Sequence, residues 1–73
     1  MTSNEGNLVD LQIIAGDIAE IHGARVDKHE IKPGLWIASI ETDEGAVKGE
    51  GGSEAAAFGN LIANAKAEGW APK

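Results

Sequence analysis

The chain has 73 residues, with twelve acidic and six basic side chains, a formal net charge of −6 at pH 7, and no cysteine. This length allows one small hydrophobic core and no second domain, and the missing cysteines exclude disulfides and cysteine-ligated zinc. The acidic balance removes the affinity for nucleic acids that comes from counterion release, and no apolar run approaches the ~20 residues of a transmembrane helix.

The first predicted element is a helix. Residues 1–6 are polar and have no periodicity, so we expect a disordered tail that precedes one domain spanning residues 7–73. Asn7 is a suitable N-cap residue. Apolar residues then recur at helical spacing, which predicts a helix from about residue 8 to residue 22 that ends at Gly23. The face expected to be buried contains Leu8, Leu11, Ile14, Ala15, Ile18, Ile21 and His22.

Two strands are predicted next. In residues 25–32, Val26 and Ile31 are an odd number of positions apart, so they cannot share one face of a regular strand. We therefore expect an irregular or bulged edge strand there. Residues 35–42 follow a Pro-Gly turn and are rich in strand-forming residues, which predicts a strand with apolar side chains on both faces and Trp36 in the core.

A hairpin and a second helix complete the prediction. Residues 43–45 are a hairpin turn signal, and residues 46–49 form a short return strand that the following glycine pair ends. Those glycines are interpreted as a flexible joint between strand and helix. Ser53 is the expected N-cap of the second helix, which Gly69 closes and Pro72 prevents from continuing. Its apolar stripe consists of Phe58, Leu61, Ile62 and Ala65.

This order, α-β-β-β-α, predicts an α+β domain in which two helices cover one face of a small three-stranded antiparallel sheet. If residues 25–32 are not a strand, the alternative is a two-stranded sheet in the order α-β-β-α. Because the strand at residues 35–42 is apolar on both faces, we expect the open face to need cover from a second copy or a partner protein.

No constellation of residues indicates catalysis, so we predict a protein that is not an enzyme and holds no cofactor or metal. His22 and His29 lack the spacing of metal ligands. Ser39 and Ser53 are not in a nucleophile elbow. The glycine-rich segment before Ser53 lacks the lysine of a phosphate-binding loop, because Gly52 occupies that position.

Residues 49–65 (GEGGSEAAAFGNLIANA) resemble the last strand and helix of the double-stranded RNA-binding domain, whose pattern is roughly G-x-G-x-S-K-K-x-A-K. The agreeing positions are Gly49, Gly51, Ser53 and Ala57. The family's lysine positions are Glu54, Ala55 and Phe58 here. The resemblance implies the α-β-β-β-α fold but argues against direct nucleic-acid binding, since the phosphate-gripping lysines are missing. The segment is also similar to HicB-type antitoxins, which implies a homodimer or a protein partner.

In size and composition the chain resembles small phage proteins that disable host machinery, such as the RNA polymerase regulator of a Xanthomonas phage. This resemblance implies a phage-encoded regulator that binds bacterial RNA polymerase and inhibits or reprograms transcription. The absence of cysteine fits the reducing cytoplasm of a host cell, where we expect the protein to act. The alternatives are an antitoxin-like homodimer and a residual nucleic-acid binder.

We expect the partner to present a basic surface. On the first helix, Ile13 stands among acidic residues on the side opposite the apolar stripe, where it suits an anchor in a partner's pocket. An ordinary solvated face with one stray isoleucine is the alternative interpretation. Trp70 either contacts the partner or folds back on the second helix, and the hairpin acids could mimic phosphates. The predicted contact residues are Val9, Asp10, Ile13, Asp17, Glu20, Asp43, Glu44, Glu50 and Trp70.

Overall fold

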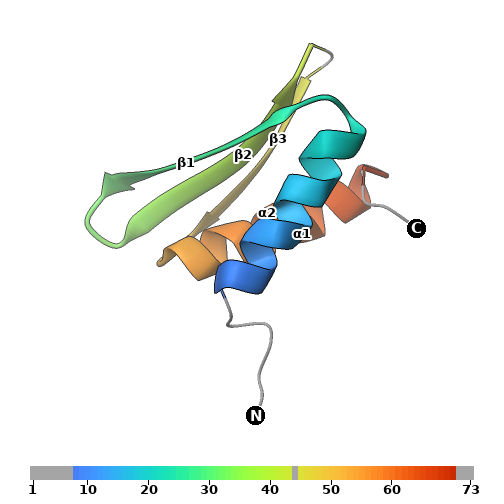
Figure 1. Ribbon diagram of the computed structural model, residues 1–73. Coiled ribbons are helices and arrows are strands. Elements are labelled where there is room, and N and C mark those ends of the chain that lie inside the picture. The colour runs from blue at the N-terminus through green and yellow to red at the C-terminus, as the bar shows by residue number, and fades with distance from the viewer. Residues whose placement is uncertain (1–7, 44, 71–73) are drawn as a thin grey trace.

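The computed structural model describes residues 8–43 and 45–70, which form two layers. Both helices lie on the same side of a three-stranded antiparallel sheet (Figure 1). This confirms the predicted α+β class and the α-β-β-β-α order, so the two-stranded alternative is wrong. The expectations for residues 1–6, Asn7, Glu44 and Pro72 lie outside the described residues. The elements are α1 (Leu8–Ile21), β1 (Arg25–Lys32), β2 (Leu35–Thr42), β3 (Gly45–Gly51) and α2 (Glu54–Ala67).

The sheet is built around β2, which pairs with β1 on one side and β3 on the other. β1 is the predicted bulged edge strand, because its register against β2 shifts between Glu30 and Lys32 and leaves Ile31 exposed. On the side of the helices, β2 places Ala38 and Ile40 in the core, where both are fully buried. Trp36 shares that side but is only partly buried at the margin of the core.

The opposite face of β2 carries Leu35, Ile37 and Ser39, and no described element covers it. The pairing registers place Ile37 between His29 of β1 and Glu50 of β3. Leu35 and Ile37 are half-buried and Ser39 is buried, although all three lie on the open face. Flanking polar side chains can shield apolar residues in this way, so the expected need for a covering chain does not follow from the fold.

The glycines of β3 allow α2 to lie directly on the sheet. A Cβ atom added to Gly49 would stand 2.5 Å from the carbonyl oxygen of Ala57 and closer still to the backbone nitrogen of Leu61. One added to Gly51 would stand 2.7 Å from the backbone nitrogen of Ala57. The flexible joint predicted at Gly51-Gly52 is therefore wrong for Gly51, whereas Gly52 does lie between β3 and α2. Gly49 and Gly51 pair with β2 in a strand that is longer than the predicted 46–49, and they make room for a helix.

Two side chains of α2 reach the outer edge of β3. Asn60 and Asn64, one turn apart, donate hydrogen bonds to the carbonyl oxygens of Glu50 and Lys48. Alternate residues of an edge strand point their carbonyls away from the neighbouring strand, and these two carbonyls find their partners on α2. The side-chain hydrogen bonds of the described residues include none to a carbonyl at the outer edge of β1.

The buried face of α1 differs from the predicted one. Leu11, Ala15, Ile18 and Ala19 are buried, but Ile14 and Ile21 are 41% and 59% exposed. His22 lies beyond the helix and is exposed as well. The difference is a rotation: the small side chains of Ala15 and Ala19 turn toward the core, which carries Ile14 and Ile21 outward on one flank.

The termini of both helices follow the sequence signals. Gly23 and Gly69 have positive φ angles of 63° and 81°, which suit glycine at a helix C-terminus. The backbone N–H of Ala24 and of Trp70 then closes the last turn of α1 and α2, respectively. At the start of α2, the hydroxyl of Ser53 accepts a hydrogen bond from the backbone nitrogen of Ala56 at 3.1 Å.

Replacing Ser53 with alanine is expected to lower the free energy of unfolding by about 1 kcal/mol, because the N–H of Ala56 loses its capping partner. Urea unfolding followed by circular dichroism would measure the loss. Aspartate is an equally good cap, so Ser53→Asp is the matched control and should retain most of the stability. An unfolding midpoint of Ser53→Ala equal to that of the wild type would contradict a capping role.

Candidate protein-binding surface

The outer face of α1 is unusually apolar for a solvent-exposed helix face. Among the described residues, five large hydrophobic side chains are exposed, and four of them belong to this helix. Val9 and Ile13 are 62% and 56% exposed, and Ile14 and Ile21 flank them. The exposed side of a surface helix is normally polar, so these side chains mark a surface that gains from being covered.

The same face is acidic. Asp10, Asp17 and Glu20 are all exposed, and α1 contains no lysine or arginine. The structure therefore brings together all five contact residues predicted on the first helix. It adds Ile14 and Ile21, which the helical period predicts to be buried. We refer to this set of seven residues as the outer face of α1: Val9, Asp10, Ile13, Ile14, Asp17, Glu20 and Ile21.

The remaining predicted contact residues are not gathered in one place. Asp43 follows the end of β2, whereas Glu50 pairs with Ile37, which lies five residues before Thr42 on β2. At the rise of a β-strand this separation is roughly 17 Å, so these two acids do not form one phosphate-like cluster. Glu44 lies outside the described residues. Trp70 is far from α1 in the sequence, but in the folded chain it lies near the C-terminal end of α1.

Trp70 contacts His22, the residue that directly follows α1. The ring centroids of His22 and Trp70 are 4.8 Å apart, and Nε2 of His22 donates a hydrogen bond of 3.0 Å to the carbonyl oxygen of Trp70. The indole is partly buried and also touches the core. Trp70 thus folds back on the described part of the chain, and the sequence carried no signal for its contact with a residue 48 positions away.

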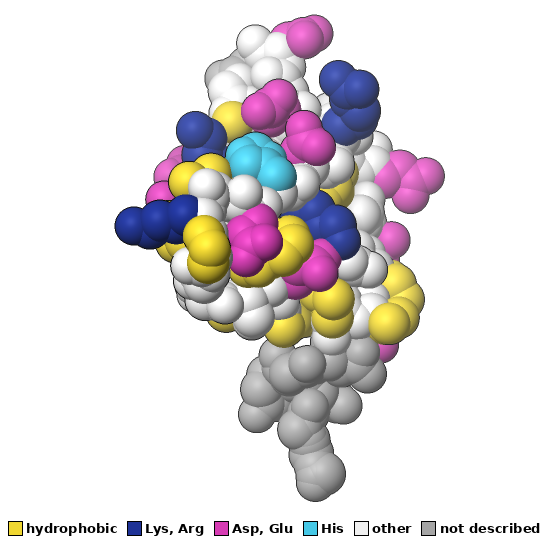
Figure 2. All heavy atoms as spheres, turned by 90° about the vertical axis from the view of Figure 1, so that its left-hand side faces the viewer, with side chains coloured by type: hydrophobic (Ala, Val, Ile, Leu, Met, Phe, Trp, Pro, Cys, Tyr) yellow, Lys and Arg dark blue, Asp and Glu magenta, His cyan; other side chains and the backbone are white. Residues whose placement is uncertain are grey.

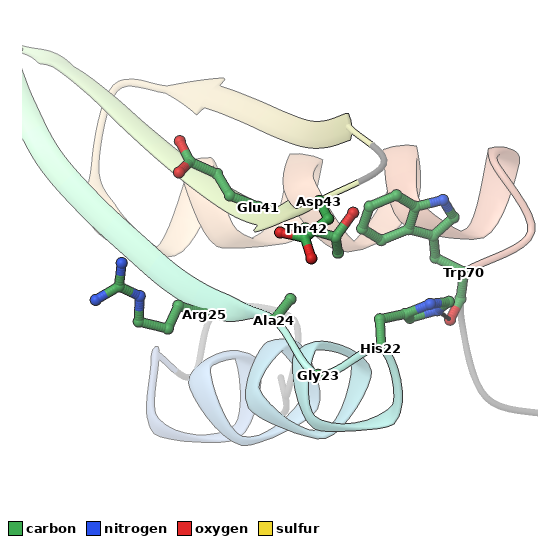
Figure 3. Close-up of a pocket in the computed structure, with 8 residues that line it drawn as sticks. All are labelled: His22, Gly23, Ala24, Arg25, Glu41, Thr42, Asp43 and Trp70. Carbon is green, nitrogen blue, oxygen red and sulfur yellow. Dashed lines mark hydrogen bonds between the residues drawn. The ribbon is translucent and has the colours of Figure 1, made fainter.

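These two side chains line a cleft of about 670 Å³ at this end of the molecule (Figure 3). The cleft lies where the end of α1, the start of β1, the end of β2 and the segment after α2 meet. Its polar lining includes Arg25, Glu41 and Asp43. The hydroxyl of Thr42 is directed into the hairpin, where it donates to the carbonyl oxygen of Gly45 at 3.0 Å.

The sheet side of the molecule has a different character. Figure 2 shows acidic, basic and hydrophobic side chains interspersed on this side, with no continuous area of one charge. At the N-terminal end of α2, Glu54 forms an ion pair with Lys28 of β1. An acid therefore stands where an RNA-binding domain of the resembled type has lysine. The sheet side offers neither a basic track nor a large apolar patch.

The described residues contain no group of three or more histidine, cysteine or acidic side chains placed to hold a metal. Neither of the two described helices is long and apolar enough to cross a membrane. Comparison of the chain with models of protein families, with curated proteins and with solved structures finds no match. The surface chemistry is therefore the basis for a functional proposal.

Proposed function

We propose that this chain is a small protein-binding regulator that docks the outer face of α1 on a partner protein with a basic, apolar groove. The observation that carries the proposal is the coincidence of exposed aliphatic and acidic side chains on one helix. Ile13 lies at the middle of this face, with Val9 one turn before it and Asp17 one turn after it. Amphipathic helices bind grooves through such apolar residues at one-turn spacing.

The charge of this face favours a partner protein over a second copy of the chain. Two copies that met through this face would bring Asp10, Asp17 and Glu20 against the same three acids, with no basic side chain of α1 to compensate. Like charges placed together at an interface cost affinity. A groove rimmed by lysine and arginine would instead attract the acids, as the net charge of −6 also would at longer range.

Bacterial RNA polymerase is the first partner to test, because the size and composition of the chain resemble those of the phage-encoded polymerase regulators. In that case the chain would inhibit or reprogram transcription after docking. An antitoxin-like homodimer and a residual nucleic-acid binder remain the alternatives. The charge of the outer face of α1 and the Lys28–Glu54 pair at the start of α2 favour a protein partner over both.

Replacing Ile13 with aspartate is expected to weaken partner binding at least about tenfold, because a charge replaces the central apolar contact. Biolayer interferometry with immobilised bacterial RNA polymerase would measure the dissociation constant. The matched control is Ala63→Asp, which adds the same charge at an exposed position of α2.

Equal weakening by the two substitutions would trace the effect to net charge, and wild-type affinity of Ile13→Asp would exclude the outer face of α1. If the wild-type chain does not bind the polymerase, that partner is excluded. Retardation of labelled double-stranded RNA or DNA at physiological salt would favour the nucleic-acid alternative, and a dimeric mass by light scattering would favour the homodimer.

A further inference from the structure

The cleft beside Trp70 combines an aromatic wall with an excess of negative charge. The charged residues that line it are Arg25, Glu41 and Asp43. Arg25 and Glu41 are directly paired across β1 and β2, so their opposite charges stand side by side. Asp43 has no such basic neighbour in the pairing of the strands and supplies the net charge of the cleft.

The chain's own arginine does not fill the space beside the indole. In the view of Figure 3, Arg25 and Glu41 extend away from Trp70, and Asp43 lies between them and the ring. The ring of His22 is already engaged, because its Nε2 atom donates to the carbonyl oxygen of Trp70. An indole and a carboxylate therefore face a part of the cleft into which Arg25 does not extend.

We propose that this cleft receives an arginine side chain of the partner, with its guanidinium group stacked on Trp70 and paired with Asp43. A planar cation suits both the indole of Trp70 and the carboxylate of Asp43, since guanidinium groups stack on aromatic faces and form paired hydrogen bonds with carboxylates. A cleft of about 670 Å³ has room for this side chain and the backbone that carries it. The inference deepens the proposed function and rests on it, because it names a second contact to the same basic partner.

The position of the cleft supports a shared partner. His22 directly follows Ile21, the last residue of the outer face of α1, and His22 lines the cleft. A partner that covers this helix face therefore reaches the cleft without crossing another element. An arginine at the margin of a basic groove would enter between Trp70 and Asp43.

The test uses a small probe, so that it does not depend on finding the partner. Nα-acetyl-arginine amide is titrated into ¹⁵N-labelled protein, and the two indole N–H signals are followed by NMR. The chain has two tryptophans, so the signal of Trp36 serves as an internal reference. The indole signal that disappears in the Trp70→Phe variant is the signal of Trp70. Nα-acetyl-citrulline amide, a neutral molecule of nearly the same shape, is the control probe.

We expect the arginine probe to shift the Trp70 signal, with little shift from the citrulline probe and little change at Trp36. Asp43→Asn should lower the affinity for the arginine probe about threefold. Asp27→Asn, the same change on the open face of β1, should leave this affinity unchanged. Equal shifts from the two probes, an unmoved Trp70 signal, or equal weakening by both substitutions would overturn the proposal. If the probe binds as expected but Ile13→Asp leaves polymerase binding intact, the proposed docking face fails and the arginine site stands.

Discussion

Gly49→Ala is expected to abolish the cooperative folding of this domain. The added methyl group would stand 2.5 Å from the carbonyl oxygen of Ala57 and even nearer to the backbone nitrogen of Leu61. Because both are backbone atoms of α2, the clash can only be relieved by lifting the helix from the sheet. Overpacking typically costs 1–3 kcal/mol when side chains can adjust, and we expect more than about 3 kcal/mol here.

The chain offers a matched control for this substitution. Gly59 lies inside α2, and a Cβ atom added to it would meet nothing within 4 Å. Gly59→Ala should therefore stabilise the domain by about 0.5–1 kcal/mol through the helix propensity of alanine. Thermal melting followed by circular dichroism would measure both variants. If Gly49→Ala melts at the temperature of the wild type, α2 does not lie on β3 as described.

Ile18→Asp is the second substitution with a large expected effect. Ile18 is fully buried in the core and is among its largest side chains. The substitution removes this apolar side chain, at a cost of roughly 2–5 kcal/mol, and places a carboxylate where it has no partner. A small domain has only a few kcal/mol of stability, so we expect the chain to be unfolded at 25 °C.

Ile13→Asp is the control on the same helix, because Ile13 is 56% exposed. The change in chemistry is identical, but we expect it to cost less than about 1 kcal/mol, as is usual for exposed positions. Far-UV circular dichroism and the dispersion of amide signals in NMR would separate the two variants. Wild-type melting of Ile18→Asp, or unfolding of Ile13→Asp, would mean that the buried face of α1 is assigned incorrectly.

The elements of this fold were predictable because their ends carry local signals. Ser53, Gly23 and Gly69 mark helix termini through backbone chemistry that depends only on neighbouring residues. The bulge in β1 was visible in the odd spacing of its apolar side chains. The extent of β3 beyond residue 49 was not predictable in the same way, because Gly51 disfavours a strand locally and is required there only by the approach of α2.

The candidate surface was predictable in part. The helical period separated Ile13 from the core correctly, but it placed Ile14 and Ile21 inside it. Their exposure depends on the rotation of α1 about its axis, which is set by the packing of Ala15 and Ala19 against the rest of the core. Because alanine contributes little to an apolar pattern, the sequence does not reveal this rotation. The cleft could not be predicted, since His22, Asp43 and Trp70 come from distant segments that meet only in the folded chain.

The two asparagines of α2 also restrict how copies of this chain can assemble. A fibre of stacked sheets needs two open edges on every copy, so that each new molecule adds to the last. In this domain Asn60 and Asn64 donate hydrogen bonds to outward-facing carbonyls of β3, so of the two sheet edges in the described part of the chain only the edge of β1 is open to another strand. Growth by strand pairing would therefore stop at two molecules, which makes the domain poorly suited to endless polymerisation even at the high concentrations of overexpression.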